Sequence, residues 1–312
     1  MPKYVTFTVR ARYSAPGAAT LRAMDQLRVT ANGVDFAYLA DGPEDGPLAL
    51  CLHGFPDTAH SWRYLLPRLA AGGYRAVAPF MRGYAPTAVP ADGRYDTGTL
   101  ALDACALHDA LGGSDQAVIV GHDWGAFATY GAAAHQPERW RRVVTAAVAP
   151  TASMAAGFFS FDQLKRSWYV FFFQTALAEY GVGIDDMAFL DRLWADWSPG
   201  YDGAADAALV KGALADPERL TAALGYYRSM FAGPPDHAEA AAAQAAGGTV
   251  CPQPTLYLHG ADDGCMGLDT IGPVTEFLSP GSEMVVLDGA GHFLQVERPS
   301  AFNDHVLRFL GE

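Results

Sequence analysis

The sequence predicts an α/β fold in which helices flank a mostly parallel central sheet and a helical cap is inserted between two strands. Two observations carry this prediction. Short apolar runs typical of buried strands alternate with segments of helical period, and such strand–helix–strand units produce parallel sheets. Between about residues 151 and 247 the alternation stops and only helical patterns remain.

The predicted strands begin with a hairpin and continue as buried single runs. Residues 27–30 and 34–38 are β-like and flank Asn32-Gly33, a strong hairpin signal. The run at 48–52 is apolar throughout, as in a strand that is covered on both faces. The remaining predicted elements are, in chain order, a strand at 75–78, a helix at 98–111, a strand at 117–120, a helix at 124–135 and strands at 143–149, 255–259 and 284–287.

The helical insertion divides the predicted core into two parts. Residues 1–150 form the first part of the core, 151–247 form the cap and 248–312 form the second part. The insertion is rich in alanine and aromatic residues, and Gly247-Gly248 ends it. Its helices are expected at 161–180, 185–197, 216–230 and 238–246.

Charge and composition exclude several classes of function. The 312 residues carry a formal net charge of −13, which leaves no electrostatic footprint for DNA or RNA. Residues 1–19 lack the apolar core of a signal peptide, and no apolar run approaches the roughly 18 residues of a membrane span. The four cysteines form no CxxC pair and are expected to be free thiols. We therefore expect a soluble cytoplasmic protein without a nucleic-acid partner, and the sequence leaves its oligomeric state, homo-oligomer included, open.

Asp123 is the candidate nucleophile. It stands between Gly121 and Gly125 in the run Gly-His-Asp-Trp-Gly, where a predicted buried strand passes into a helix. Small residues at these two positions allow a tight turn that lifts the central side chain above the end of the strand. A carboxylate is anionic at neutral pH and attacks without the help of a base, which gives an ester. The alternative is an aspartate that only caps the following helix.

Two further segments supply the other groups that this chemistry needs. The backbone N–H groups of Phe55, in the run His-Gly-Phe-Pro, and of Trp124 are expected to form an oxyanion hole. His292 follows a predicted strand near the end of the chain and is the candidate base for a water molecule. Asp263 is preferred as the carboxylate partner of this histidine, with Asp262 as the alternative.

Three segments together resemble the epoxide hydrolases of the α/β-hydrolase superfamily, which are relatives of the haloalkane dehalogenases. The segments are GHDWGA around Asp123, HGFPDTAHSWR after the third strand and AGHFLQVERP around His292. The resemblance extends over residues 27–150 and 251–312. It implies an α/β-hydrolase fold, a catalytic triad of Asp123, His292 and Asp263, and hydrolysis of an apolar epoxide to a vicinal diol.

In the cap the resemblance is confined to two segments and implies two proton donors. The segment WYVFFFQ places the first donor at Tyr169, and YYR places the second at Tyr227. A phenol suits this task because it can hydrogen-bond the oxygen of an opening epoxide and then release its proton. The alternatives are Tyr180 for the first donor and Tyr226 for the second, or plain packing of these rings.

Other reactions are compatible with the same triad. A haloalkane dehalogenase would use it at a halogenated carbon, but many such enzymes carry a polar halide-binding residue where this chain has Phe55. Haloacetate dehalogenases resemble the chain less, because residues 124–127 offer no arginine for a carboxylate. A non-catalytic binding protein with the same fold is a third alternative. For an epoxide hydrolase we expect no cofactor, no metal and an apolar pocket wall that includes Trp168 and Phe172.

Overall fold

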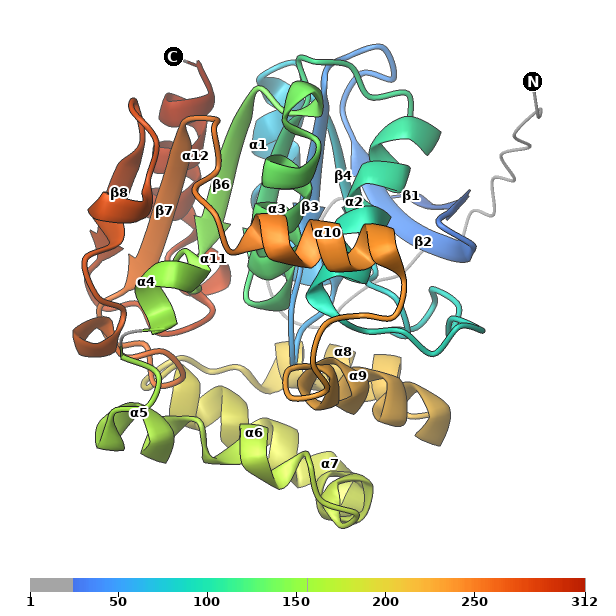
Figure 1. The fold of residues 1–312 in the computed structure, drawn as a ribbon, viewed down its shortest axis with the longest axis vertical. Coiled ribbons are helices and arrows are strands. Elements are labelled where there is room, and N and C mark those ends of the chain that lie inside the picture. Colours follow the sequence, from blue (N-terminus) through green and yellow to red (C-terminus); the bar gives the residue numbers. More distant parts are fainter. Residues whose placement is uncertain (1–24, 156, 312) are drawn as a thin grey trace.

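The computed structural model describes residues 25–155 and 157–311, and an eight-stranded sheet forms its centre (Figure 1). The sheet order is β1-β2-β4-β3-β5-β6-β7-β8. The prediction for residues 1–19 lies outside the described part of the chain. In sequence order the strands are β1 (Asp25–Ala31), β2 (Val34–Asp41), β3 (Leu48–Leu52), β4 (Arg75–Pro79), β5 (Val118–His122), β6 (Arg142–Ala146), β7 (Thr255–Gly260) and β8 (Glu283–Leu287).

Among the described strands, antiparallel pairing is confined to one edge of the sheet. β1 pairs with β2 and β2 with β4 in antiparallel register, and the other neighbours are parallel. The hairpin turn places Asn32 and Gly33 at φ 46° and 74°, the left-handed conformation that tight hairpins favour. β3 and β5 are buried at every residue. The predicted mostly parallel α/β sheet is therefore confirmed.

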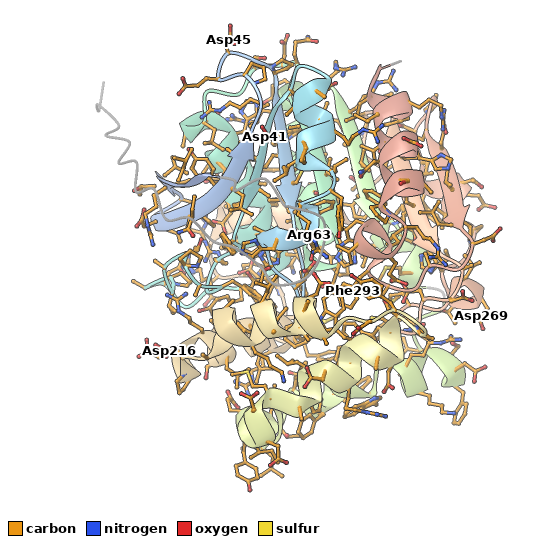
Figure 2. All side chains as sticks on the ribbon, turned by 180° about the vertical axis from the view of Figure 1, so that it is seen from behind. Asp41, Asp45, Arg63, Asp216, Asp269 and Phe293 are labelled. Carbon is orange, nitrogen blue, oxygen red and sulfur yellow. The ribbon has the colours of Figure 1, made fainter. Side chains whose placement is uncertain are left out.

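Helices cover both faces of the sheet. α1 and α12 lie together on one face, which faces the viewer in Figure 2, and α2, α3 and α10 pack on one another on the opposite face (Figure 1). None of the helices in the described part of the chain is long and apolar enough to cross a membrane. The helices outside the cap region are α1 (Leu66–Ala71), α2 (Thr97–Ala110), α3 (Trp124–His135), α11 (Leu294–Glu297) and α12 (Pro299–Gly311), with short 3-10 turns at Ala59–Trp62, Pro137–Arg139, Leu268–Thr270 and Val274–Phe277.

The segment between β6 and β7 is helical. Its helices α5 to α9, here called the cap, form a layer across one end of the sheet (Figure 1). α10 instead packs on α2 and α3. The boundaries predicted for the insertion, 151 and 247, remain a prediction. The helices are α4 (Thr151–Ala155), α5 (Phe161–Arg166), α6 (Trp168–Phe172), α7 (Ala178–Trp197), α8 (Ala204–Leu214), α9 (Pro217–Ser229) and α10 (Ala238–Gly247).

Several element boundaries differ from the predicted ones for local reasons. The helix expected at 161–180 is broken into α5, α6 and the start of α7. α7 itself is kinked where Asp185, Asp186 and Met187 take left-handed backbone angles. β6 ends at Ala146, because Ala147 has φ 65° and leaves the extended conformation. α8 was not predicted.

Buried polar contacts fix the cap on the sheet. The indole N–H of Trp194 donates to the Pro56 carbonyl at 2.9 Å. The hydroxyl of Tyr226 donates to the carbonyl of Arg82 at 2.8 Å. Figure 2 shows Arg63 at the junction between the sheet and the cap. It forms a largely buried ion pair of 2.6 Å with Asp206 of α8. The cap is thereby held over the carboxyl ends of the parallel strands.

Candidate active site

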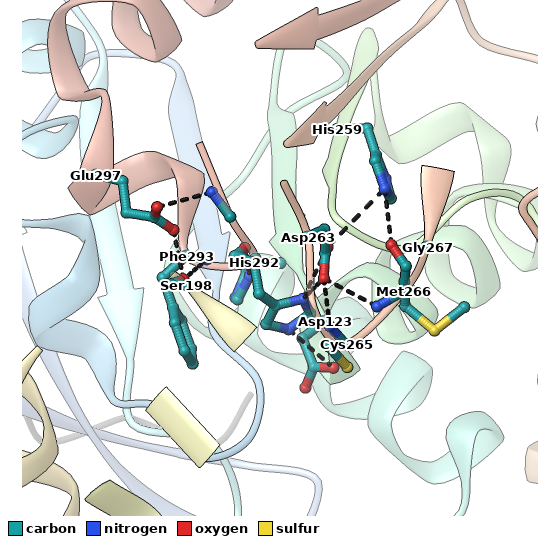
Figure 3. Close-up of polar contacts among 12 residues, drawn as sticks. Asp123, Ser198, His259, Asp263, Cys265, Met266, Gly267, His292, Phe293 and Glu297 are labelled. Atoms are coloured by element: carbon teal, nitrogen blue, oxygen red, sulfur yellow. Dashed lines mark hydrogen bonds and ion pairs between the residues drawn. The ribbon is translucent and has the colours of Figure 1, made fainter. Parts of the chain in front are cut away.

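Four loops bring chemically active groups together at the carboxyl ends of neighbouring strands. Asp123 follows β5 and Phe55 comes after β3, while Asp263 and His292 come after β7 and β8. In parallel sheets these strand ends meet at one edge, which is where ligands bind. Figure 3 shows the ring of His292 between the carboxylates of Asp263 and Asp123.

Asp123 occupies a strained turn between β5 and α3. Its backbone angles are φ 52° and ψ −119°, which a non-glycine residue rarely adopts. A Cβ added at Gly125 would lie 2.1 Å from the Leu52 carbonyl, and one at Gly121 would lie 2.3 Å from the Gly125 carbonyl. Both flanking positions therefore require glycine. The Asp123 side chain makes no capping hydrogen bond to α3, so capping does not explain its presence there.

A backbone donor meets one oxygen of this carboxylate. The Phe55 N–H donates to Asp123 Oδ1 at 2.7 Å. The backbone nitrogen of Trp124 is in the same neighbourhood, because a Cβ added at Gly54 would be 2.1 Å from Asp123 Oδ1 and 2.6 Å from Trp124 N. The two residues predicted for the oxyanion hole are thus adjacent to Oδ1, although only the Phe55 bond has full hydrogen-bond geometry among the described residues.

The histidine lies between the two carboxylates. His292 Nδ1 is 3.0 Å from Asp263 Oδ2, and His292 Nε2 is 3.7 Å from Asp123 Oδ2. Asp263 is buried and its Oδ1 also accepts the backbone N–H groups of Cys265 and Met266 at 2.8 and 2.9 Å. Asp262 is exposed. The structure therefore places Asp263, and not Asp262, beside His292.

Several residues that sequence reasoning did not single out hold the histidine loop. The Ser198 hydroxyl donates to Glu297 Oε1 at 2.5 Å and accepts the Phe293 N–H at 3.2 Å. Glu297 Oε2 accepts the Gly291 N–H at 2.7 Å (Figure 3). His122 Nε2 is 2.9 Å from the His292 carbonyl. These contacts fix the backbone on both sides of the imidazole.

The two carboxylates govern the charge of His292. Burial alone would lower the pKa of this imidazole, but the negative charge of Asp263 and the contact with Asp123 outweigh burial and raise the pKa of His292 to about 10. Burial likewise opposes ionisation of Asp263, but the imidazolium outweighs it and lowers the pKa of Asp263. With a pKa of about 10, His292 is an imidazolium at neutral pH.

Two cap tyrosines face Asp123. The rings of Tyr169 (α6) and Tyr227 (α9) lie edge to face, with centroids 5.5 Å apart. The Tyr169 hydroxyl contacts Cys265 Sγ at 3.3 Å. The buried Tyr227 hydroxyl makes no hydrogen bond of good geometry among the described residues, although the Trp124 side chain is near enough to oppose part of the rise in its pKa. Burial raises the pKa of both phenols, so both retain their protons at neutral pH.

The alternative tyrosines lie elsewhere. Tyr226 neighbours Tyr227 in sequence, but its hydroxyl is engaged with the carbonyl of Arg82. Tyr180 is 70% exposed on the cap. The structure therefore brings Tyr169 and Tyr227 to Asp123 and leaves the other two away from it.

A cavity of about 30 Å³ joins Asp123 to the two tyrosines, and we call it the catalytic cavity. This is room for about one water molecule. Most residues of its wall are not predicted by local sequence patterns, although Phe127, one helical turn after Asp123, lies on the same face of α3. The other lining residues are Trp124, Phe127, Val148, Met154, Phe158, Ser167, Val170, Met230, Cys265 and Met266.

Trp168 and Phe172, expected to bind the substrate, are not among these lining residues. α6 turns Tyr169 into the catalytic cavity, and the preceding residue consequently faces another direction. Trp168 is 49% exposed and lines a separate depression, to which α5, the end of α7 and Gly264 also contribute. Phe172 stacks on Phe189 of α7 at 5.9 Å. The role of both residues in substrate binding stays a prediction, and the apolar wall of the catalytic cavity comes from α3, α4, α6, α9 and the loops.

One cluster of side chains of the types that bind metals includes two members of the predicted triad. Atoms of Asp263, Cys265 and His292 lie within 4.8 Å of one another. Asp263 and His292 already bind each other, and burial raises the pKa of the Cys265 thiol, which disfavours the thiolate that metals prefer. The arrangement is suited to proton transfer, and the absence of a metal or cofactor from the reaction remains a prediction.

Comparison with known proteins agrees with this geometry. The family described as the alpha/beta hydrolase fold matches residues 47–299 of the chain. The chain belongs to the α/β-hydrolase family. Its relatives include epoxide hydrolase A of Mycobacterium tuberculosis, which is 30% identical over 94% of this chain and 98% of that protein. Epoxide hydrolase 3 of Xenopus tropicalis is also 30% identical, over 96% of this chain and 82% of that protein.

Solved structures of epoxide hydrolases are also similar to this α/β-hydrolase. An epoxide hydrolase of Bacillus megaterium, crystallised with an inhibitor, superimposes with a TM-score of 0.77 at 25% identity over 91% of this chain and 100% of that one. Epoxide hydrolase A of Mycobacterium thermoresistibile gives a TM-score of 0.74 at 26% identity over 92% and 98%. The predicted fold and the resemblance to epoxide hydrolases are therefore confirmed, and the chain is a hydrolase.

Proposed function

We propose that this α/β-hydrolase opens an epoxide with Asp123 and then hydrolyses the resulting ester, with water activated by His292 and Asp263, to release a vicinal diol. The arrangement around Asp123 carries the proposal. One carboxylate oxygen accepts the Phe55 N–H at 2.7 Å, and the other lies 3.7 Å from His292 Nε2. The names of the relatives support the choice of an epoxide as the substrate.

Ring opening would use the oxygen that is not held by the backbone. Asp123 Oδ2 attacks a ring carbon and forms the ester bond, while the carbon–oxygen bond of the ring breaks and leaves its electron pair on oxygen. A phenol donates its proton to this oxygen. Tyr227 is the first choice as donor because its hydroxyl has no established hydrogen-bond partner, whereas Tyr169 must leave Cys265.

Ester formation would switch the histidine from acid to base. The ester has lost the negative charge of Asp123, which is one of the causes that raise the pKa of His292 to about 10. The imidazolium then gives up its proton more readily, this proton restores the phenol, and the neutral imidazole takes a proton from water. The hydroxide adds to the ester carbon, and the charge that develops on Oδ1 meets the N–H groups of Phe55 and Trp124. Collapse of this intermediate breaks the bond between the ester carbon and the alkoxide oxygen, the imidazolium returns a proton to that oxygen to give the diol, and the carboxylate is restored.

A labelling experiment tests the proposal. Styrene oxide is converted under single-turnover conditions in water that contains heavy oxygen, and protein and diol are analysed by mass spectrometry. The ester route puts the label into Asp123 and leaves the first diol unlabelled. Label in the first diol means direct attack by water and would contradict the proposal. Bromoalkanes are incubated in parallel, since halide release without diol formation from epoxides would indicate a dehalogenase.

Matched variants identify the residues involved. Asp123→Asn removes the nucleophile and is expected to abolish diol formation, provided that deamidation is excluded by mass spectrometry. Asp263→Asn is expected to slow ester hydrolysis by at least about 100-fold, because the imidazolium loses its charge partner. The exposed neighbour variant Asp262→Asn is the control and is expected to retain full activity. Equal loss in both would argue against the assignment of Asp263.

A further inference from the structure

We propose that the substrate is an epoxide with an elongated, uncharged apolar tail, and that this tail occupies a second cavity, here called the tail pocket. The inference rests on the proposed function, because it places the epoxide end at Asp123. The tail pocket measures about 230 Å³ and lies among the start of α2, the middle of α3, the end of α9 and α10. It is lined by Thr97, Gly131, Thr151, Ser229, Ala243, Gln244, Gly247 and Gly248, together with Phe127 and Met230.

The catalytic cavity alone does not explain how a substrate fits. Its volume of about 30 Å³ leaves room for little beyond the reacting atoms. A substituent on the epoxide must therefore extend past the wall of this cavity. Phe127 and Met230 belong to the walls of both cavities, so they form the partition between them.

The path from Asp123 to the tail pocket follows α3, which sets its direction and length. Asp123 is the N-cap of this helix, and Phe127 and Gly131 follow at four-residue intervals. Residues at this spacing lie on one face of a helix, about 6 Å apart along its axis. A tail that runs along this face reaches the tail pocket after about 6 Å and its far wall after about 12 Å.

The partition between the cavities is able to yield. Met230 follows α9, is 39% exposed and has an unbranched, flexible side chain. Phe127 is only partly buried. The opposite wall is rigid, because a Cβ at Gly98 would lie 1.8 Å from the Ala240 carbonyl and one at Gly247 would lie 3.2 Å from Gly131 Cα. α10 is thus tightly packed on α2 and α3. The path can therefore widen only by movement on the side of Met230.

The chemistry of the lining favours an uncharged apolar ligand. None of its lining residues carries a charge. Its polar side chains already have partners: Thr97 donates to Gln244 Oε1 at 3.1 Å, and Ser229 donates to the Tyr226 carbonyl at 2.6 Å. The surface left for a ligand consists mainly of Phe127, Met230 and small residues. Transfer of a hydrocarbon tail from water into this pocket favours binding, whereas a charged tail would find no group of opposite charge there.

Binding of reaction products tests the tail pocket without relying on catalysis. Calorimetry measures the affinity of a long vicinal diol, dodecanediol, and of a short one, butanediol. Wild-type protein is expected to bind the long diol at least tenfold more tightly. In Gly248→Phe this preference is expected to fall to near one, because the new ring fills the tail pocket. The backbone at Gly248 has φ −83°, which suits any residue, and an added Cβ would meet only the Ala245 carbonyl at 3.3 Å.

Three further variants guard against a trivial explanation. Gly212→Phe introduces the same side chain on α8, where an added Cβ meets nothing within 4 Å, and it is expected to retain the wild-type preference. Met230→Trp places a larger side chain in the partition between the two cavities. It is expected to weaken binding of the long diol at least fivefold relative to Met230→Leu. A preference that survives both Gly248→Phe and Met230→Trp would overturn the proposal.

Turnover separates this inference from the proposed function. The kcat/KM for epoxydodecane is expected to exceed that for epoxybutane at least tenfold in wild-type protein. Equal values for the two epoxides, together with equal binding of the two diols, would refute the tail pocket and leave the proposed function intact. No diol from either epoxide would refute the proposed function, whereas loss of long-diol binding in Gly248→Phe would still support the tail pocket.

Discussion

Replacing Gly54 by alanine is expected to disable the nucleophile without unfolding the protein. The added Cβ would lie 2.1 Å from Asp123 Oδ1 and 2.6 Å from Trp124 N, while ordinary contact begins at 3.4 Å. The carboxylate or the loop must therefore shift by about 1 Å, a displacement that typically costs about 100-fold in rate. That loss corresponds to about 2.7 kcal/mol of transition-state stabilisation. The hydrogen bond from the Phe55 N–H to Oδ1 is lost in the same movement.

Stopped-flow fluorescence resolves the affected step. Trp124 lies beside the nucleophile, so its emission is expected to report ester formation during a single turnover of styrene oxide. In Gly54→Ala the rate of this phase is expected to fall about 100-fold, while thermal unfolding shows a native fold. Gly212→Ala is the control: its Cβ meets nothing within 4 Å, so it should retain the wild-type rate. A rate for Gly54→Ala within twofold of wild type would refute the argument from Gly54.

Four other predictions concern the triad, the phenols and the core. His292→Gln is expected to accumulate the alkyl ester, seen as an added epoxide mass; full turnover would exclude His292 as the base. In the folded protein the pKa of His292 is about 10, above the usual 6.5. The charged imidazolium therefore stabilises the folded state fully below pH 6.5, and this stabilisation is lost as the pH rises towards 10. The melting temperature of wild type should therefore fall over this range more steeply than that of His292→Gln. Tyr227→Phe is expected to lower kcat about 100-fold, and more than Tyr169→Phe does; the reverse order would contradict the donor assignment. Arg82→Met leaves buried Asp103 without its partner and is expected to cost about 3–5 kcal/mol in the free energy of unfolding, measured by urea titration; a loss under 1 kcal/mol would be inconsistent with this buried pair.

Local patterns predicted those parts of the molecule that depend on neighbouring residues in the chain. Apolar runs identified the strands, although β8, which was predicted to be buried, is only partly buried at the edge of the sheet. Two glycines around Asp123 identified the turn, because a side chain at Gly125 would collide with the Leu52 carbonyl. The spacing of His292 after a strand pointed to the same edge of the sheet. Each of these signals is contained within a few residues.

The unpredicted parts depend on contacts between distant segments. Trp168 and Phe172 are as aromatic as Tyr169, and only the packing of α6 against α7 decides which side chain faces the catalytic cavity. Cys265 is two residues from Asp263 in sequence, but its contact with Tyr169 requires the cap to be in place. Likewise, the rise in the pKa of His292 results from burial between two carboxylates that come from different strands.

In the proposed mechanism, the carbonyl of Trp197, at the end of α7, couples the position of the cap to the second half-reaction. It accepts the backbone N–H of His292 and that of Gly264, each at 3.0 Å, so one cap atom tethers the loops that carry His292 and Asp263. Lifting α7 would release both loops at once. An open molecule could then admit or discharge a ligand but could not complete hydrolysis, and substitutions that loosen α7 should appear as a long-lived covalent intermediate before they appear as weakened affinity.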